Sequence, residues 1–571
     1  MLALPRQWLN MFYPLSKIVN LEVARKFALQ NAILHGGKAD SDAVLRKVLA
    51  EDPALKSKVK EIASRIKMVV EDINKLSLEQ QRNELETIAP ELLEKSKETK
   101  SHELPPLIKI DEKVVMRLAP YPSGPLHIGN ARMVLLNDEY VKRHKGKLIL
   151  MFDDTIGSGE KYILPESYNQ IRDGLDWLGV EYHNVLYKSD RLPIFYEWAG
   201  KLIDGNHAYV CECSYTELRA LREGREQCSH RLNSIEKNLE KWQVMLNGGY
   251  GEGEAVLRLK TRMDHPDPAF RDRVLFRISK REHPRVGKRY YVWPLLEFSW
   301  AVDDFLLGIT HILRGKDLII EDEMEIAIWD DLGIARRPKF IHYGMLFFKE
   351  FELSKSKYRK AIEEGKIEGI EDPRTWTLQS LKKRGIQPQA LRRFILSFGL
   401  SLTDIEVPAD NLYSENRRII DSKSDRYFFV PSPVKIEIES MPDVNEARVP
   451  VHPDFPEKGY RKLRVESRLY ISSEDLETLK GKEVRLKDLF NIALDKRSKF
   501  LSIEVRDIPK IQWLANGIQT SVMMPDGSFI EGLADVSLSD AKIGDIVQFE
   551  RFGFVRIDKI KPEIKAYFAH R

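Results

Sequence analysis

The chain has 571 residues, of which 43% are hydrophobic and 31% charged, and its formal net charge at pH 7 is +4. This length suggests roughly three to five domains, and the hydrophobic share excludes an intrinsically disordered chain. With so small a net charge, the protein as a whole has no strong positive electrostatic potential that attracts nucleic acid. Any contact with nucleic acid must therefore come from local basic faces. No apolar run reaches the ~18 residues of a membrane span, and the first residues lack a secretory pattern. We therefore expect a multidomain cytoplasmic protein with no membrane partner.

Residues 1–104 are predicted to be helical. Apolar residues recur at helical spacings of four and three through Leu55, Val59, Ile62, Ile66 and Val69. The Leu/Glu/Lys-rich pattern over residues 79–98 suits an interaction arm, but a core or solvated helix is the preferred interpretation. Nothing in this segment indicates catalysis, and its protein partners are not identified by the sequence.

A strand, a glycine-containing loop and a helix are predicted next. Residues 117–130 read RLAPYPSGPLHIGN, follow an apolar run typical of a buried parallel strand, and precede residues with helical periodicity. The loop therefore lies at a helix N-terminus, where free N–H groups and the helix dipole attract anions. Gly124 and Gly129 permit close approach of a phosphate, and His127 adds a hydrogen-bond donor. This pattern predicts a nucleotide site; the alternative is a plain Pro/Gly-rich connection.

A second strand is predicted over residues 147–152, followed by Asp153 and then by a helix that Pro165 can open. This alternation indicates a parallel, doubly wound sheet. In such a sheet a ligand lies at the carboxyl ends of the strands.

All three cysteines of the chain lie in one segment, Cys211, Cys213 and Cys228, and His230 follows. An isolated disulfide scaffold is excluded. Four soft or borderline ligands suit tetrahedral Zn²⁺, and its role would be structural because no open position remains for water. The alternative is a set of buried, reduced thiols. The segment around them, residues 206–290, reads as a subdomain inserted into the sheet.

The sheet is expected to resume near Tyr290 and to continue over residues 308–317 and 340–351, with helices to about residue 400. Beyond Pro408, short alternating runs over residues 462–471, 500–505 and 545–557 indicate β-barrels. Four clusters of basic residues could each contact nucleic acid or simply face solvent, and for any one cluster taken alone we favour exposure to solvent. They are Arg336-Arg337-Pro338-Lys339, Lys382-Lys383-Arg384, Arg392-Arg393 and Arg417-Arg418.

Two segments carry a family resemblance. Residues 117–130 resemble the "HIGH" motif of class I aminoacyl-tRNA synthetases of the glutamyl/glutaminyl subclass, with Asn130 in place of the last His, and an amide can still donate a hydrogen bond. Residues 352–357, ELSKSK, resemble the "KMSKS" loop, with Glu352 replacing the first lysine and Lys355 at the second-lysine position. The β-rich tail resembles archaeal and eukaryotic glutamyl enzymes, which carry two anticodon-binding barrels.

The resemblance implies an ATP site with Mg²⁺ in the substrate complex, and it implies catalytic roles for His127, Asn130 and Lys355. The implied ATP-binding residues are Pro120, Gly124, His127, Gly129, Asn130, Ser354, Lys355 and Ser356.

The resemblance also implies an amino-acid site. Asp153 falls where the subclass holds the substrate ammonium group, and Arg117 and Arg314 fall at its arginine positions. Two arginines match a diacid, whereas the alternative for each is an internal salt bridge. Arg314 favours glutamate over glutamine, because glutaminyl enzymes generally lack this arginine. Three departures from the subclass, Ile156, Leu296 and Trp300, are expected to reshape the pocket.

The implied fold is a Rossmann-like catalytic domain of class I synthetase type (α/β). The implied reaction is ATP-dependent ligation of L-glutamate to tRNA(Glu) through glutamyl-adenylate. The sequence leaves open whether tRNA(Gln) is charged as well, and no DNA partner is expected. The alternatives are a glutaminyl-tRNA synthetase and a non-catalytic RNA-binding paralogue. The expected parts are a helical N-terminal extension (1–104), the catalytic domain (105–205 and 291–335), an inserted acceptor-stem-binding subdomain (206–290), a KMSKS-like loop with stem-contact helices (336–408) and anticodon-binding barrels (409–571).

Overall fold

The computed structural model describes residues 21–34, 37–51, 59–89, 92, 104–108, 112–156, 162–351 and 355–571. The chain divides into two units, Met1–Ser101 and His102–Arg571. Among the described residues, no helix combines the length and the apolar character needed to cross a lipid bilayer.

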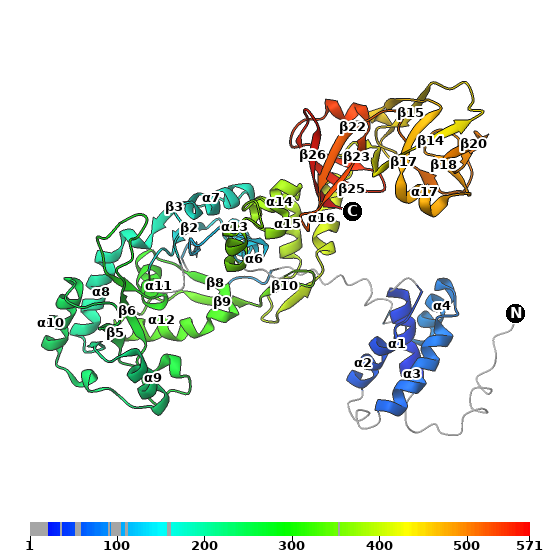
Figure 1. The fold of residues 1–571 in the computed structure, drawn as a ribbon. Helices are drawn as coiled ribbons and strands as arrows, with labels where there is room; N and C mark the ends of the chain where they lie inside the picture. The colour runs from blue at the N-terminus through cyan, green and yellow to red at the C-terminus, as the bar shows by residue number, and fades with distance from the viewer. Residues whose placement is uncertain are drawn as a thin grey trace. The chain divides into compact units, whose positions relative to one another are not determined.

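The described residues of the first unit form helices, as predicted (Figure 1). Its core includes Ile62 and Ile66, with Val69 packed against it, so the predicted apolar face is confirmed there, but Val59 is exposed and Leu55 lies outside the described residues. The buried Gln81 amide donates to the carbonyl oxygens of Gly37 and Ile73, both at 2.9 Å. The helices are α1 (Leu21–Leu34), α2 (Ser41–Glu51), α3 (Val59–Ile73) and α4 (Leu78–Ile88).

The second unit begins with the predicted parallel sheet. Strand β1 (Val115–Leu118) pairs with β2 (Lys147–Phe152), which pairs with β3 (Asn184–Tyr187). Helix α6 (Ile128–Arg143) connects β1 to β2, and α7 (Ser167–Trp177) follows β2. Helix α7 begins two residues after Pro165, which lies in a turn. The predicted order of strand, loop and helix is confirmed.

A second parallel pair continues this layer. Strand β8 (His311–Gly315) pairs with β9 (Lys339–Tyr343). Thr310, immediately before β8, donates its backbone N–H to the Val115 carbonyl oxygen at 2.9 Å. Arg117 of β1 and Arg314 of β8 therefore come from neighbouring parallel strands, and Asp153 follows β2.

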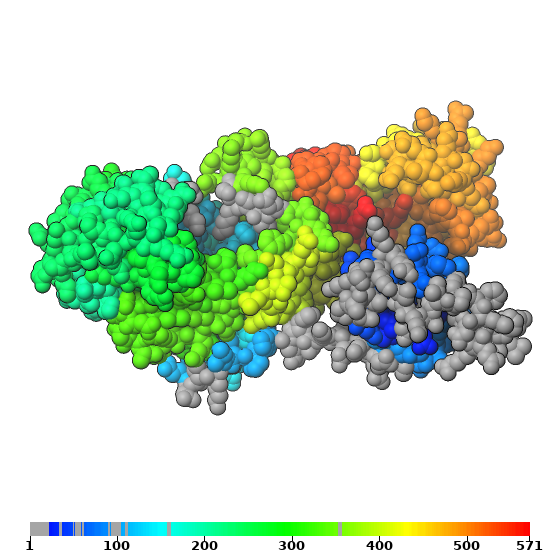
Figure 2. Space-filling model, turned by 90° about the horizontal axis from the view of Figure 1, so that it is seen from below, coloured from blue at the N-terminus to red at the C-terminus, as the bar shows by residue number. Residues whose placement is uncertain are grey.

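The inserted segment forms its own antiparallel sheet, ordered β4-β5-β6-β7. Its last strand, β7, pairs with β6 through Ile278 and Val292, so this sheet extends beyond residue 290 and no catalytic strand resumes there. Helix α8 (Leu192–Asp204) leads in, and in the space-filling view the insertion forms a green and blue-green lobe (Figure 2). Its elements are β4 (Ala208–Cys211), α9 (Tyr215–Gly224), α10 (Ile235–Leu246), β5 (Val256–Leu259), β6 (Val274–Ile278) and β7 (Val292–Pro294).

Helices precede, connect and follow strands β8 and β9. Strand β10 (Leu346–Phe348) pairs with β11 (Ile405–Val407) in a separate sheet, so the prediction that residues 340–351 extend the main sheet is wrong beyond β9. Arg384 is fully buried and donates to the Ala569 carbonyl oxygen at 2.8 Å, so this member of the candidate basic faces does not contact RNA. The helices are α11 (Leu296–Leu306), α12 (Ile319–Asp331), α13 (Lys355–Glu363), α14 (Leu378–Arg384), α15 (Pro388–Leu396) and α16 (Asp410–Ile420).

The C-terminal region contains the predicted β-structure in two sheets. In the seven-stranded sheet, the end strands β12 and β13 are separated by Phe428 alone, so this sheet is nearly closed. Its strands are β12 (Arg426–Tyr427), β13 (Phe429–Pro431), β22 (Ile518–Met523), β23 (Phe529–Ala534), β24 (Ile546–Phe549), β25 (Gly553–Lys559) and β26 (Ile564–His570).

The six-stranded sheet is built from the residues between β13 and β22, and a hairpin, β15 (Glu446–Pro450) and β16 (Tyr460–Arg464), accompanies it. The predicted run 500–505 ends earlier, at Ser502. The strands of the sheet are β14 (Pro433–Glu439), β17 (Arg468–Ser472), β18 (Glu483–Leu486), β19 (Asn491–Ala493), β20 (Arg497–Ser502) and β21 (Lys510–Ile511), and helix α17 (Ser473–Leu479) follows β17.

Candidate active site

His127 is the N-cap of α6, and its contacts fix how its ring is protonated. Its Nδ1 atom accepts a hydrogen bond from the Gly129 N–H at 3.1 Å, while its backbone N–H donates to Asn130 Oδ1 at 3.2 Å. This is a reciprocal capping box. A ring nitrogen that accepts a hydrogen bond carries no proton, so the ring proton lies on Nε2. Asn130 uses its oxygen for the cap, which leaves its NH₂ group as a donor.

The loop between β1 and α6 is held from both sides. The Pro120 carbonyl oxygen accepts from the Asp153 N–H at 3.1 Å, and the Ile128 N–H donates to the Trp376 carbonyl oxygen at 3.0 Å. Gly124 has φ +153°, a conformation that side chains with a β-carbon rarely adopt. The loop backbone is therefore fixed before any ligand binds.

A cavity of about 320 Å³ adjoins this loop. It is bounded by Gly124 and His127, by Glu166 next to α7, and by Tyr358 of α13. Lys355 and Ser356 begin α13, whereas Ser354 lies outside the described residues. The roles of these last three residues in binding ATP stay predictions.

The residues predicted to bind the amino acid are brought together around one indole ring. The guanidinium carbons of Arg117 and Arg314 lie 5.0 and 5.1 Å from the centroid of Trp300, and Lys188 Nζ lies 5.2 Å from it. Lys188 is also 3.1 Å from Asp153 Oδ1. Three cations thus surround the buried ring at distances typical of cation–π contacts.

Each arginine is also paired with buried carboxylates. Arg117 donates to Asp304 through two hydrogen bonds of 2.5 and 2.6 Å. Arg314 donates to Glu325 at 2.7 Å and pairs with Asp322. These are internal ion pairs of the kind weighed as the alternative for both arginines. Lys188 carries no motif in the sequence, and neither this lysine nor the pairing of the arginines with these particular carboxylates was predicted.

Burial weakens the compensation of Arg314. Desolvation raises the pKa of the fully buried Glu325 to about 8, while the neighbouring Arg314 opposes this rise. Desolvation also raises the pKa of Asp303, which pairs with Arg191 at 2.6 Å, to about 6. Glu325 therefore compensates Arg314 less fully than an ordinary carboxylate would, and Asp322 is the second partner of this arginine.

Two of the departures noted in the sequence line this region. Trp300 is 5% exposed, and its indole N–H has no acceptor among the described residues. Ile156 is buried against Leu192 and Trp293. The indole N–H is therefore a buried donor beside the two arginines.

The cysteines and His230 form a compact cluster at the end of β4. Their four ligand atoms lie within 4.8 Å of one another. Cys211 Sγ is 3.6 Å from Cys228 Sγ, and Cys213 Sγ is 3.4 Å from His230 Nδ1. A tetrahedral Zn²⁺ with bonds of about 2.3 Å places sulfur ligands about 3.8 Å apart, which these separations match.

The surroundings of the cluster fit a cation. His230 directs Nδ1 toward the sulfurs and Nε2 toward Glu212 Oε2 at 3.4 Å, the carboxylate contact that metal-bound histidines commonly make. The hydrogen bond from the Cys211 thiol lowers the pKa of Cys228 below its usual range. A thiolate is the form that binds metal.

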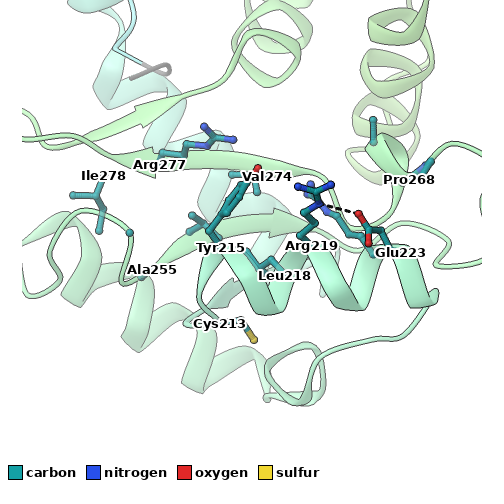
Figure 3. Close-up of a pocket in the computed structure, with 14 residues that line it drawn as sticks. Cys213, Tyr215, Leu218, Arg219, Glu223, Ala255, Pro268, Val274, Arg277 and Ile278 are labelled. Carbon is teal, nitrogen blue, oxygen red and sulfur yellow. Dashed lines mark hydrogen bonds and ion pairs between the residues drawn. The ribbon is translucent and has the colours of Figure 1, made fainter. Parts of the chain in front are cut away.

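A second cavity, of about 410 Å³, lies in the inserted subdomain beside Cys213. Figure 3 shows Leu218 and Arg219 of α9 along it, with Arg219 paired to Glu223 at 2.8 Å. The exposed side chains of Tyr215 and Arg277 also line this cavity. The cavity combines apolar side chains such as Leu218 and Ile278 with basic and aromatic side chains at its margins.

Comparison with known proteins matches most of the second unit to one family. Residues 113–421 match the catalytic domain of class I tRNA synthetases (E and Q), and residues 424–507 and 509–558 match their anticodon-binding domains. The chain is 45% identical to a glutamate–tRNA ligase of Pyrococcus abyssi, covering 96% of this chain and 99% of the relative. It is 43% identical to the ligase of Methanocaldococcus jannaschii, covering 93% and 96%. The chain belongs to the glutamyl and glutaminyl family of class I tRNA synthetases.

Proposed function

We propose that the protein is a glutamate–tRNA ligase, which activates L-glutamate with ATP and transfers it to tRNA in the cytoplasm. The observation that carries this proposal is the pair of arginines around Trp300, at the carboxyl ends of β1 and β8. Two guanidinium groups match the two carboxylates of glutamate. The names of the relatives support the same substrate, and the cluster of three free thiols suits a reducing compartment.

The chemistry of activation requires donors rather than a base. The substrate carboxylate is already ionised when it attacks the α-phosphorus of ATP, and negative charge then develops on the phosphate oxygens as pyrophosphate leaves. The Nε2–H of His127, the N-terminus of α6 and Lys355 would stabilise this charge. Mg²⁺ bound with ATP supplies further positive charge.

The amino-acid pocket would select its substrate by charge. Arg314 would pair with one carboxylate of glutamate and Arg117 would orient the other, with the Trp300 N–H as an additional donor. Asp153 would receive the α-ammonium group. Glutamine offers a neutral amide in place of the side-chain carboxylate, so it would leave Arg314 without a new partner.

Aminoacylation of tRNA(Glu) and tRNA(Gln) transcripts with glutamate and with glutamine tests the proposal. Charging of tRNA(Glu) with glutamate is expected, and the tRNA(Gln) reaction would tell whether the enzyme is non-discriminating. Charging with glutamine alone would identify a glutaminyl enzyme instead. No charging and no ATP–pyrophosphate exchange with either amino acid, despite RNA binding, would leave a non-catalytic paralogue.

The cluster of Cys211, Cys213, Cys228 and His230 would hold one structural Zn²⁺. We expect one zinc per chain by elemental analysis of protein purified without affinity metals, because such binding contributes ~10 kcal/mol to local folding. Cys228→Ser should abolish this stoichiometry. It should also raise the KM for tRNA, since the inserted subdomain would contact the acceptor stem.

Ser229→Ala is the matched control, because Ser229 lies between two proposed ligands in sequence and is exposed. It should keep both the metal and the wild-type KM. Protein without stoichiometric metal, whose three thiols all react freely with a thiol reagent, would contradict the zinc proposal.

A further inference from the structure

Lys188 places a buried ammonium group inside the amino-acid pocket. It lies in a short 3₁₀ turn directly after β3 and is fully buried. Its Nζ atom is 3.1 Å from Asp153 Oδ1 and donates to Ser299 Oγ at 2.6 Å. Asp153 is itself 1% exposed, so water does not screen this ion pair.

We propose that Lys188 is a specificity-determining residue that competes with the α-ammonium group of the substrate for Asp153. The inference rests on the proposed function, which assigns Asp153 to that ammonium group. The side-chain ammonium group of Lys188 would thus occupy the position that the α-ammonium group of the substrate takes on binding. An amino acid could use Asp153 fully only after Lys188 gives up this contact.

The competition follows from the charges in the pocket. One buried carboxylate between two ammonium groups compensates each of them poorly, and the two cations repel each other at short range. Lys188 has two other contacts that can retain it, the hydroxyl of Ser299 and the ring of Trp300. Arg117 and Arg314 flank the same ring but are paired with their own carboxylates, so the competition for Asp153 is between the two ammonium groups. A ligand with an ammonium group is therefore penalised, whereas a ligand with carboxylates alone is not.

This reasoning predicts a gain of affinity on mutation. Lys188→Gln removes the competing charge and retains a group that can bond to Ser299. We expect the KM for glutamate, measured with saturating tRNA, to fall by about tenfold. The change in kcat should be smaller than this change in KM. Without ligand the variant should melt at a lower temperature, because Asp153 loses its compensating charge. Glutamate should then raise the melting temperature by more than it does in the wild type.

Two controls separate competition from a general structural effect. Lys201→Gln is matched, because Lys201 also pairs with a carboxylate, Glu197 at 2.8 Å, and lies over an indole ring, that of Trp198, but is exposed. It should leave the KM unchanged. Glutarate, which has both carboxylates of glutamate but no ammonium group, should inhibit Lys188→Gln no better than the wild type. Lys188→Arg keeps the charge and should not lower the KM.

An unchanged or higher KM in folded Lys188→Gln would overturn the proposal, as would an equal gain for glutarate. If Lys188→Gln does not fold, Lys188→Met, which is also unbranched and uncharged, must show the same gain in the thermal shift with glutamate. The proposed function is judged separately, by whether the wild type charges tRNA with glutamate. A wild type that charges tRNA, with no gain in the variants, would reject the role of Lys188 alone.

Discussion

His127→Ala is expected to lower the rate of ATP–pyrophosphate exchange with glutamate by about 10²–10³. The substitution removes the Nε2–H donor that would stabilise charge on the phosphate oxygens. It also removes the side chain that caps α6 by accepting from the Gly129 N–H. Exchange kinetics and thermal melting, measured together in the presence of tRNA, distinguish the two losses. On the basis of the sequence motif alone, Lys355→Ala should cause a rate loss of the same size.

His127→Asn is the informative control for this prediction. An asparagine side chain is a good N-cap, so it should restore the stability of about 1 kcal/mol that loss of the cap costs. The amide does not reproduce the reach of the imidazole to a phosphate, so activity should stay low. If His127→Ala retains near-normal turnover while folded, the proposed nucleotide site is wrong.

Arg314→Gln is expected to lower kcat/KM for glutamate by about 10³ and to lower that for glutamine far less. The reason is that one carboxylate of glutamate then lacks its partner in a desolvated pocket. Both values should be measured with saturating tRNA. The variant should still fold, because burial raises the pKa of Glu325 and so favours the neutral form of this carboxyl group once the arginine is gone.

The remaining partner of Arg314 provides a check on stability. Asp322 loses its ion pair in Arg314→Gln, and the double variant with Asp322→Asn should recover part of any fall in melting temperature. Arg337→Gln, which breaks the ion pair with Asp330 near the surface, is the control and should leave both kcat/KM values unchanged. If the ratio of kcat/KM for glutamate to kcat/KM for glutamine does not change, Arg314 has a structural role only. A glutamine-specific enzyme would then again be a possible interpretation.

Local pattern was enough to predict the core of the catalytic sheet. The apolar run at residues 147–152 forms β2 over those same residues, and the loop ending at His127 caps α6. The Cys/His cluster was predictable too, because few other arrangements use those residue types together. In each case neighbours in the sequence carry the information.

Contacts between distant residues were not predictable in this way. Arg117 pairs with Asp304, 187 residues later, and the residues around each of them do not predict this pairing. Lys188 is an ordinary lysine in the sequence and becomes exceptional only through burial beside Asp153. The pairing of β10 with β11 depends on the path of the intervening helices, and periodicity does not reveal it.

The hydrogen bonds between residues 126–128 and 376–378 restrict how this protein can be divided or recombined. Ile128 donates to the Trp376 carbonyl oxygen, and Leu378 donates to that of Leu126. A fragment ending after β9 would leave these loop groups without partners, so it would not preserve the loop. Removing the barrels would break a different set of contacts, in which Arg384 donates to the Phe568 and Ala569 carbonyl oxygens and Asn416 of α16 bonds to His570. Chimeras with new anticodon specificity should therefore be joined after α16, not before α14.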